Sequence, residues 1–177
     1  MATLTELFSM HNSVLVVIPP EKYNTTITEL LLELNQLSKR TGYINMNRLI
    51  TKVRKALEQN GMDLNKYHFV DAVTKSVIPN PELYTNCLYI PSPNDLTKLS
   101  IGITKMLRNA GPDYVLFDSV SSLLIYESLE LSNQFLHSLA NKLNAFGTKS
   151  LYTCLQGEEE EKVIRSLSLV IEKVERL

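Results

Sequence analysis

The sequence of 177 residues has no tryptophan, only 6 glycines and only 2 cysteines. Cys87 and Cys154 lie far apart and outside any metal-ligand spacing, which favours a reducing, cytoplasmic location. Cys154 ends a predicted core strand and is expected to be a buried structural thiol. No apolar run approaches the ~20 residues that a membrane span needs. Residues 1–12 have no basic region followed by an apolar stretch, so no signal peptide is expected.

The sequence also has no excess of either charge. It contains 18 basic and 19 acidic residues, a formal net charge of −1. This balance argues against an overall attraction to nucleic acid or to an anionic membrane. The hydrophobic content of 44% is sufficient for a core, and the length fits one domain over residues 1–177.

What the sequence does have is a regular alternation of apolar, β-branched runs with segments of helical periodicity. Strands are predicted at 13–18, 43–46, 67–73, 114–118, 150–154 and 168–174. Helices are predicted from the Thr26-x-x-Glu29 capping box to Gly42, over 47–60, from a Ser92 cap with Pro93 in the first turn to Leu107, over 128–146 and over 158–167. The alternation predicts an α/β fold of three layers, with helices on both faces of a mainly parallel sheet.

Residues 74–93 are the least regular segment. They include four prolines, at positions 79, 81, 91 and 93. Because proline cannot donate a hydrogen bond to a sheet, we predict a surface excursion with at most a short strand at 87–90. Long irregular segments within compact domains are often functional, so a partner surface is expected here.

The run Val115-Leu116-Phe117-Asp118-Ser119-Val120-Ser121 predicts a buried strand that ends in a carboxylate. With the order of elements around it, this run resembles the RecA/KaiC superfamily of P-loop ATPases, especially archaeal KaiC-like proteins. The resemblance is specific over about residues 92–155. It implies a RecA-like fold in which Asp118 would hold magnesium through a water molecule.

The phosphate-binding loop of that family, Gly-Pro-Pro-Gly-x-Gly-Lys-Thr-Thr, aligns with Ile18–Thr26. Both prolines and both threonines are present, but Ile18, Glu21 and Tyr23 replace the glycines and Asn24 replaces the lysine. Such a loop needs the conformational freedom of glycine to wrap its backbone around phosphate, and the lysine to neutralise it. The offset Lys22 is no obvious substitute.

The resemblance also implies a catalytic glutamate after the second strand, where this chain has Asn47 and Arg48. Two catalytic parts are therefore missing, and we expect no enzyme activity and no cofactor. A vestigial nucleotide site would comprise Lys22, Asn24, Thr25, Thr26, Asp118 and Ser119. The alternative for Asp118 is a structural acid bonded to Thr25, Ser119 or a helix N-terminus, and Thr25 would then be a helix cap.

Other candidates have weaker patterns. Ser119 with His137 or His68 as base lacks the Gly-x-Ser-x-Gly elbow of a hydrolase, and the histidines have no metal-ligand spacing. Arg48, Lys52 and Lys55 are predicted on one helix face, either solvated or in contact with nucleic acid, although no aromatic residues are interleaved with them. The expected function is that of a regulatory or scaffold protein that contacts itself or another protein, with a homo-oligomer plausible. The alternatives are weak nucleotide or anion binding and nucleic-acid binding.

Overall fold

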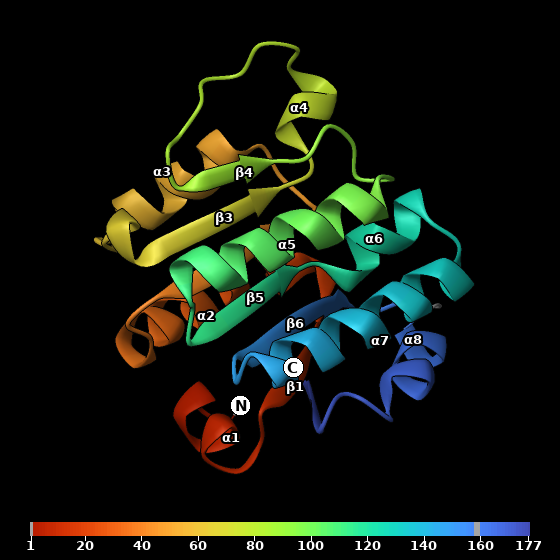
Figure 1. Cartoon of the computed structure of the whole chain (residues 1–177). Helices are drawn as coiled ribbons and strands as arrows, with labels where there is room; N and C mark the ends of the chain where they lie inside the picture. The colour runs from red at the N-terminus through yellow and green to blue at the C-terminus, as the bar shows by residue number, and fades with distance from the viewer. Residues whose placement is uncertain (1, 158–159) are drawn as a thin grey trace.

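A parallel sheet forms the centre of the molecule. The computed structural model describes residues 2–157 and 160–177. Its seven strands have the order β4-β3-β2-β5-β6-β1-β7, and every neighbouring pair is parallel (Figure 1). The strands are β1 Ser13–Ile18, β2 Thr41–Asn45, β3 Tyr67–Asp71, β4 Cys87–Tyr89, β5 Tyr114–Asp118, β6 Lys149–Leu155 and β7 Lys173–Arg176. The predicted α/β class is confirmed.

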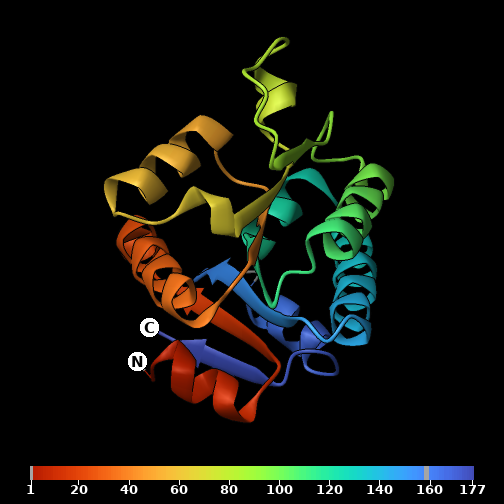
Figure 2. The same cartoon turned by 60° about the vertical axis from the view of Figure 1, so that its left-hand side comes forward.

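Helices cover both faces of this sheet (Figures 1 and 2). One face carries α1 Leu4–Met10, α2 Tyr23–Leu37 and α3 Ile50–Gln59, and the other carries α5 Leu96–Ala110, α6 Val120–Tyr126, α7 Leu129–Ala145 and α8 Glu160–Leu167. The short α4, Thr74–Val77, lies in a segment that projects from the rest of the chain (Figure 1). Among the described residues, no helix is long and apolar enough to cross a membrane.

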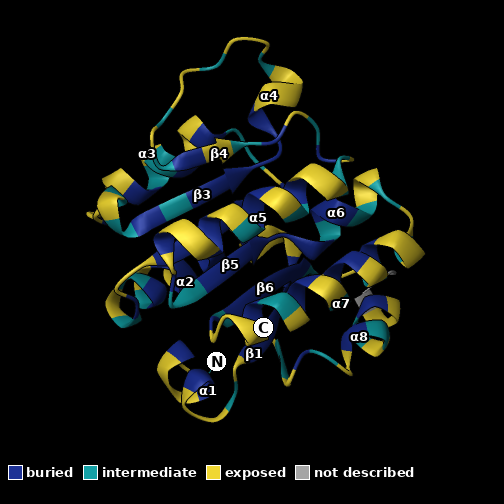
Figure 3. Ribbon diagram, viewed as in Figure 1, coloured by how far each residue is buried: buried dark blue, intermediate teal, exposed yellow. Residues whose placement is uncertain are grey.

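The central strands are buried on both faces (Figure 3). All six residues of β1 are buried: Leu15 packs into the cluster with α5–α8, whereas Val14 and Val16 pack into the cluster with α1–α3. This double burial explains the continuous apolar run that identified β1 in the sequence.

The bounds predicted for helix α2, from Thr26 to Gly42, are wrong. α2 begins at Tyr23, and Thr26, the predicted cap, is a buried residue inside the helix. The helix ends at Leu37, before Gly42, which lies within β2. A Cβ atom at Gly42 would lie 2.8 Å from Met106 Cε and 2.9 Å from Val115 Cγ2, so this glycine permits close packing rather than ending a helix.

Other predicted boundaries also shift. The cap of α5 is Asp95, whose carboxylate accepts a hydrogen bond from the Lys98 N–H, rather than Ser92. The final strand is only Lys173–Arg176. The predicted helix at 158–167 is confirmed over Glu160–Leu167, and its first two residues lie outside the described part of the chain. The expected irregular excursion at 74–93 does contain a short strand, β4, with α4 in addition.

Besides α4, two helices were not predicted from the sequence, α1 and α6. α1 has a complete capping box, in which the Thr3 side chain accepts from the Glu6 N–H and the Glu6 side chain accepts from the Thr3 N–H. α6 begins immediately after β5, with Ser119 as its cap. The sequence signal for α1 was therefore present in Thr3-x-x-Glu6.

Candidate functional site

Asp118 lies at the carboxyl end of β5, and its side chain is fully buried. β2 and β6 are the strands on either side of β5, and Asn45 of β2 lies opposite Asp118 in the register. In open parallel sheets this edge is where ligands bind. The position is the one that the RecA/KaiC resemblance implies for the magnesium-binding acid.

Side chains of this chain surround the Asp118 carboxylate. It accepts hydrogen bonds from the Tyr23 hydroxyl and, at 2.5 Å, from the Tyr43 hydroxyl. The Asn47 side-chain amide donates a weaker bond at 3.5 Å, and Arg48 Nη2 lies 3.7 Å from Oδ2 in an ion pair. The prediction that a structural Asp118 would bond to Thr25 or Ser119 is wrong, because two tyrosines provide the donors instead.

Both phenols remain protonated at neutral pH. Burial raises the pKa of Tyr23 and of Tyr43 well above the ordinary tyrosine value, and the nearby Asp118 charge raises both further. Each hydroxyl is therefore available as a donor to the carboxylate. The arrangement is a compact, charge-assisted network of the kind that stabilises a buried acid without metal.

Most of the segment that aligns with the phosphate-binding loop is helical, from Pro20 onward. Pro20–Lys22 form a 3₁₀ turn that leads directly into α2, with the Lys22 N–H bonded to Pro19 O at 3.0 Å and the Tyr23 N–H bonded to Pro20 O. Among the described residues, no non-glycine residue has a positive φ. The amides of this turn are thus bonded within the chain rather than directed around an open site.

The predicted vestigial nucleotide residues occupy different environments. Lys22, Asn24 and Thr25 are exposed, and Arg48 Nη1 donates to Asn24 Oδ1 at 3.5 Å. Thr25 lies inside α2, whose N-terminus has no side-chain cap, so its prediction as a cap is wrong. The structure brings Arg48 to Asp118, places Asn24 against Arg48, and leaves Lys22 and Thr25 in solvent.

The Ser119 side chain is bonded to the first turn of α6 rather than to a histidine. Its hydroxyl accepts from the Ser122 N–H at 3.1 Å and lies 2.9 Å from the Ser122 hydroxyl. His137 is bonded through Nε2 to the Ser166 carbonyl at 2.7 Å, between α7 and α8. Ser119 is therefore a helix cap, and the hydrolase alternative has no supporting geometry.

A second polar cluster lies next to the first, across β2 and β3. The Asn45 side-chain amide donates to Asp71 Oδ1 at 2.6 Å and to the Arg48 carbonyl at 2.5 Å. Asp71 also accepts from the Thr74 N–H at 3.2 Å, and Thr74 Oγ1 accepts from the Ile50 N–H at 2.9 Å. These bonds fix the chain between β2 and α3, and so hold Arg48 in place.

Asp71 should make the stability of the protein depend on pH. Burial raises its pKa above the ordinary value of 3.8, although the hydrogen bonds partly oppose this. The folded state then binds more protons than the unfolded state, so the contribution of Asp71 falls as pH rises from about 3.8 through the raised pKa. The unfolding free energy of Asp71→Asn relative to wild type should therefore increase across this window, as measured by urea denaturation at several pH values. A difference that is constant with pH would contradict this assignment.

The predicted basic face is not a single surface. Lys52 and Lys55 are exposed on α3, but Arg48 precedes that helix and is directed at Asp118. Both cysteines are free and buried, and within the described residues no group of three or more His, Cys, Asp or Glu side chains is placed to hold a metal.

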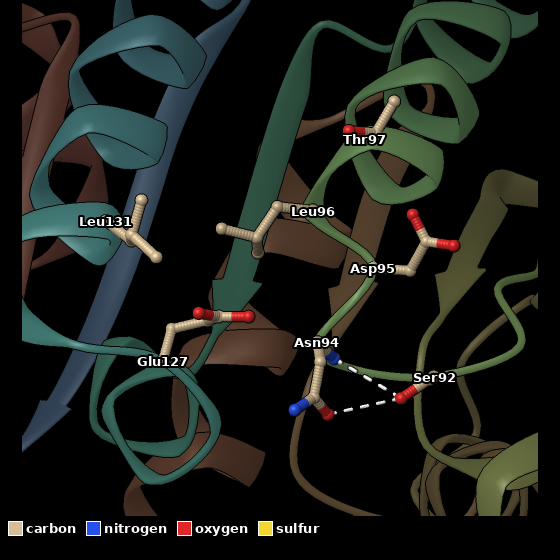
Figure 4. Close-up of a pocket in the computed structure, with 7 residues that line it drawn as sticks. All are labelled: Ser92, Asn94, Asp95, Leu96, Thr97, Glu127 and Leu131. Atoms are coloured by element: carbon tan, nitrogen blue, oxygen red, sulfur yellow. Dashed lines mark hydrogen bonds between the residues drawn. The ribbon is translucent and has the colours of Figure 1, made fainter.

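A surface cavity of about 500 Å³ lies between the start of α5 and the start of α7 (Figure 4). It is lined by Ser92 and 94–97 from the start of α5, together with Glu127 and Leu131. Asp95 is engaged as the helix cap and is paired with Lys98 at 2.8 Å. The cavity contains none of the predicted site residues.

The important residues that sequence reasoning missed are Tyr23 and Tyr43. Tyr23 was noted only as the replacement of a glycine, and Tyr43 only as the start of a strand. The available signal was their position in the chain. Tyr43 lies in a strand that ends at the same edge of the sheet as Asp118, and Tyr23 lies at the start of a helix that begins at this edge. Their pairing with the acid depends on strand order, which the local pattern does not specify.

Comparisons with known proteins agree with the fold. A family model described as "Family of unknown function (DUF7504)" matches residues 12–175. No curated protein matches. Among solved structures, the KaiC-like protein PH0186 from the hyperthermophilic archaeon Pyrococcus horikoshii OT3 is similar with a TM-score of 0.60 and 15% identity, over 82% of this chain. The match spans only 64% of that protein, and at this identity it shows the fold alone.

Proposed function

Because the chain belongs to the family of unknown function DUF7504 and shares the fold of a KaiC-like protein, we propose that it is a RecA/KaiC-like domain without ATPase activity. It acts as a regulatory or scaffold protein through contacts with itself or with another protein. The observation that carries this proposal is the occupation of Asp118 by the hydroxyls of Tyr23 and Tyr43.

Metal binding at Asp118 would have to displace this network. The carboxylate is fully buried, and a water-bridged magnesium ion would need the space that the phenols fill. If both hydroxyls moved away, the Asp118 carboxylate would remain buried without their hydrogen bonds, and its large desolvation cost would no longer be offset. Asn24 stands where the family's loop has its lysine, and the exposed Glu21 places a like charge where phosphate would approach. These features support the loss of tight Mg-ATP binding.

Isothermal titration calorimetry tests the proposal. Titration of ATP, GTP and ADP, with and without magnesium, should give no saturable heat up to about millimolar nucleotide. Submicromolar binding, or phosphate release above that of a no-protein control, would overturn it.

Weak anion binding is the second candidate. Lys22 is exposed, and the Arg48 guanidinium next to Asn24 remains partly open to solvent. Millimolar binding of pyrophosphate that Lys22→Ala abolishes, with no preference for nucleotide, would favour it. Nucleic-acid binding through Lys52 and Lys55 is tested by filter binding over a salt series, since phosphate contacts give a steep salt dependence.

A further inference from the structure

The outward face of α5 is basic with an apolar centre. Lys98, Ile101 and Lys105 recur at i, i+3 and i+7, which places them on one side of the helix. Ile101 is 50% exposed, and no acidic residue occurs within α5. Lys98 is paired with the cap Asp95, whereas Lys105 projects into solvent. A single exposed isoleucine is ordinary, but Ile101 lines the same hollow as a second exposed apolar residue, Leu88 of β4.

This face borders the strand at one end of the sheet. β4 is the outermost strand, and no described residue pairs as a strand with its outer side. α5 packs close to this corner, because a Cβ atom at Gly102 would lie 2.9 Å from Ile90 Cδ1. The result is a groove between α5 and β4, in which Leu88 is 38% exposed.

Two adjoining hollows make up this α5–β4 groove. Their volumes are about 200 Å³ and 140 Å³, and Leu88 and Lys105 line both. The ionisable side chains along the groove include Lys98, Lys105 and His68, and no aspartate or glutamate of the described chain lines it. The groove therefore combines positive charge with two exposed apolar side chains, Leu88 and Ile101.

We propose that the α5–β4 groove binds an extended, acidic segment of a partner protein, with branched apolar side chains that pack on Leu88 and Ile101. The acidic side chains pair mainly with Lys105, because Lys98 is already bonded to Asp95, and the backbone of the segment lies along the outer edge of β4. This inference rests on the proposed function, since it supplies a surface for the protein contact.

A peptide fits the groove better than a nucleic acid does. Single-stranded nucleic acid needs exposed aromatic faces for stacking. Two rings line the groove: Phe69 is buried, and Tyr89 is only partly exposed. The Tyr89 hydroxyl is bonded to the Tyr84 N–H and the Glu82 carbonyl, and Lys75 lies over the face of its ring. The exposed apolar side chains in the groove, Leu88 and Ile101, are aliphatic instead.

Fluorescence anisotropy tests this site with a defined probe. The probe is a short fluorescein-labelled peptide in which Asp and Glu alternate with Leu and Ile. It should bind the wild-type chain at low ionic strength, and Lys105→Glu and Ile101→Ser should each weaken binding by about tenfold. The matched control, Lys55→Glu on α3, makes the same charge change at an exposed site and should leave binding unchanged.

Two further probes, a serine-substituted peptide and an oligonucleotide, separate the apolar from the electrostatic contribution to binding. A peptide with Ser in place of Leu and Ile should bind about tenfold more weakly, because it lacks the apolar anchors. Failure of the acidic peptide to bind, equal binding by the serine peptide, or tighter binding of a labelled oligonucleotide that Lys105→Glu abolishes would each overturn the inference. Nucleotide calorimetry reports on the Asp118 site alone, so failure of the proposed function is distinguishable from failure here.

Discussion

Replacement of Asp118 by asparagine is expected to reduce the unfolding free energy by about 3 kcal/mol. The change removes the negative charge opposite Arg48 and leaves a single acceptor oxygen for two phenols. One of the hydroxyls of Tyr23 and Tyr43 then faces an amide donor in a site with no access to water. Urea denaturation monitored by circular dichroism measures the effect.

Asp63→Asn is the matched control for this substitution. Asp63 is exposed, and its carboxylate accepts the Asn65 N–H at 2.9 Å, which an asparagine side chain can also do. Its cost should be within about 0.5 kcal/mol of zero. An Asp118→Asn variant as stable as wild type, or more stable, would instead have the behaviour of a strained catalytic acid and would count against a structural role.

Gly42→Val is expected to have a similarly large effect, about 3 kcal/mol of lost stability. The first added carbon would lie within 3 Å of Met106 and Val115, and valine adds two further methyl groups in the middle of the sheet. Gly157→Val serves as the control, because a Cβ atom there would have no heavy atom within 4 Å.

A double-mutant cycle makes this test specific. Met106→Ala on its own removes buried side-chain volume and should destabilise the chain by about 2–4 kcal/mol. In the Gly42→Val background the same change creates room for the new methyl groups, so it should cost much less. Strictly additive free energies would show that the two side chains do not compete for the space between β2 and α5.

The architecture could be predicted from the sequence because its strongest signals are local. β1 and β5 are buried on both faces, so their continuous apolar runs are unambiguous, and Asp118 at the end of β5 marks the carboxyl edge of the sheet. Boundaries were less accurate where one residue type serves two purposes. Gly42 and Thr26 are residue types that commonly mark the ends of helices. In the fold, however, Gly42 allows Met106 and Val115 to pack close to β2, and Thr26 is buried inside α2.

The candidate site could be predicted only in part. The missing glycines and lysine were visible as substitutions, yet their replacements gave no indication of what fills the site. Tyr43 meets Asp118 because β2 and β5 are neighbours in the sheet, whereas Tyr23 reaches it from the first turn of α2, after a strand that is not next to β5. Arg48 was assigned to an exposed helix face because its spacing matched, whereas the chain between β2 and α3 turns it inward.

The place of β1 in the sheet has a consequence for biosynthesis. The hydrogen-bonding partners of this strand are Ser150–Leu155 on one side and Lys173–Arg176 on the other. The ribosome synthesises β1 long before residues 150–155 and 173–176. The backbone of β1 therefore stays unpaired, and its apolar side chains stay exposed, until those residues emerge. Pairing between such distant segments slows folding, and meanwhile the exposed β-branched strand is prone to aggregation unless a chaperone binds it.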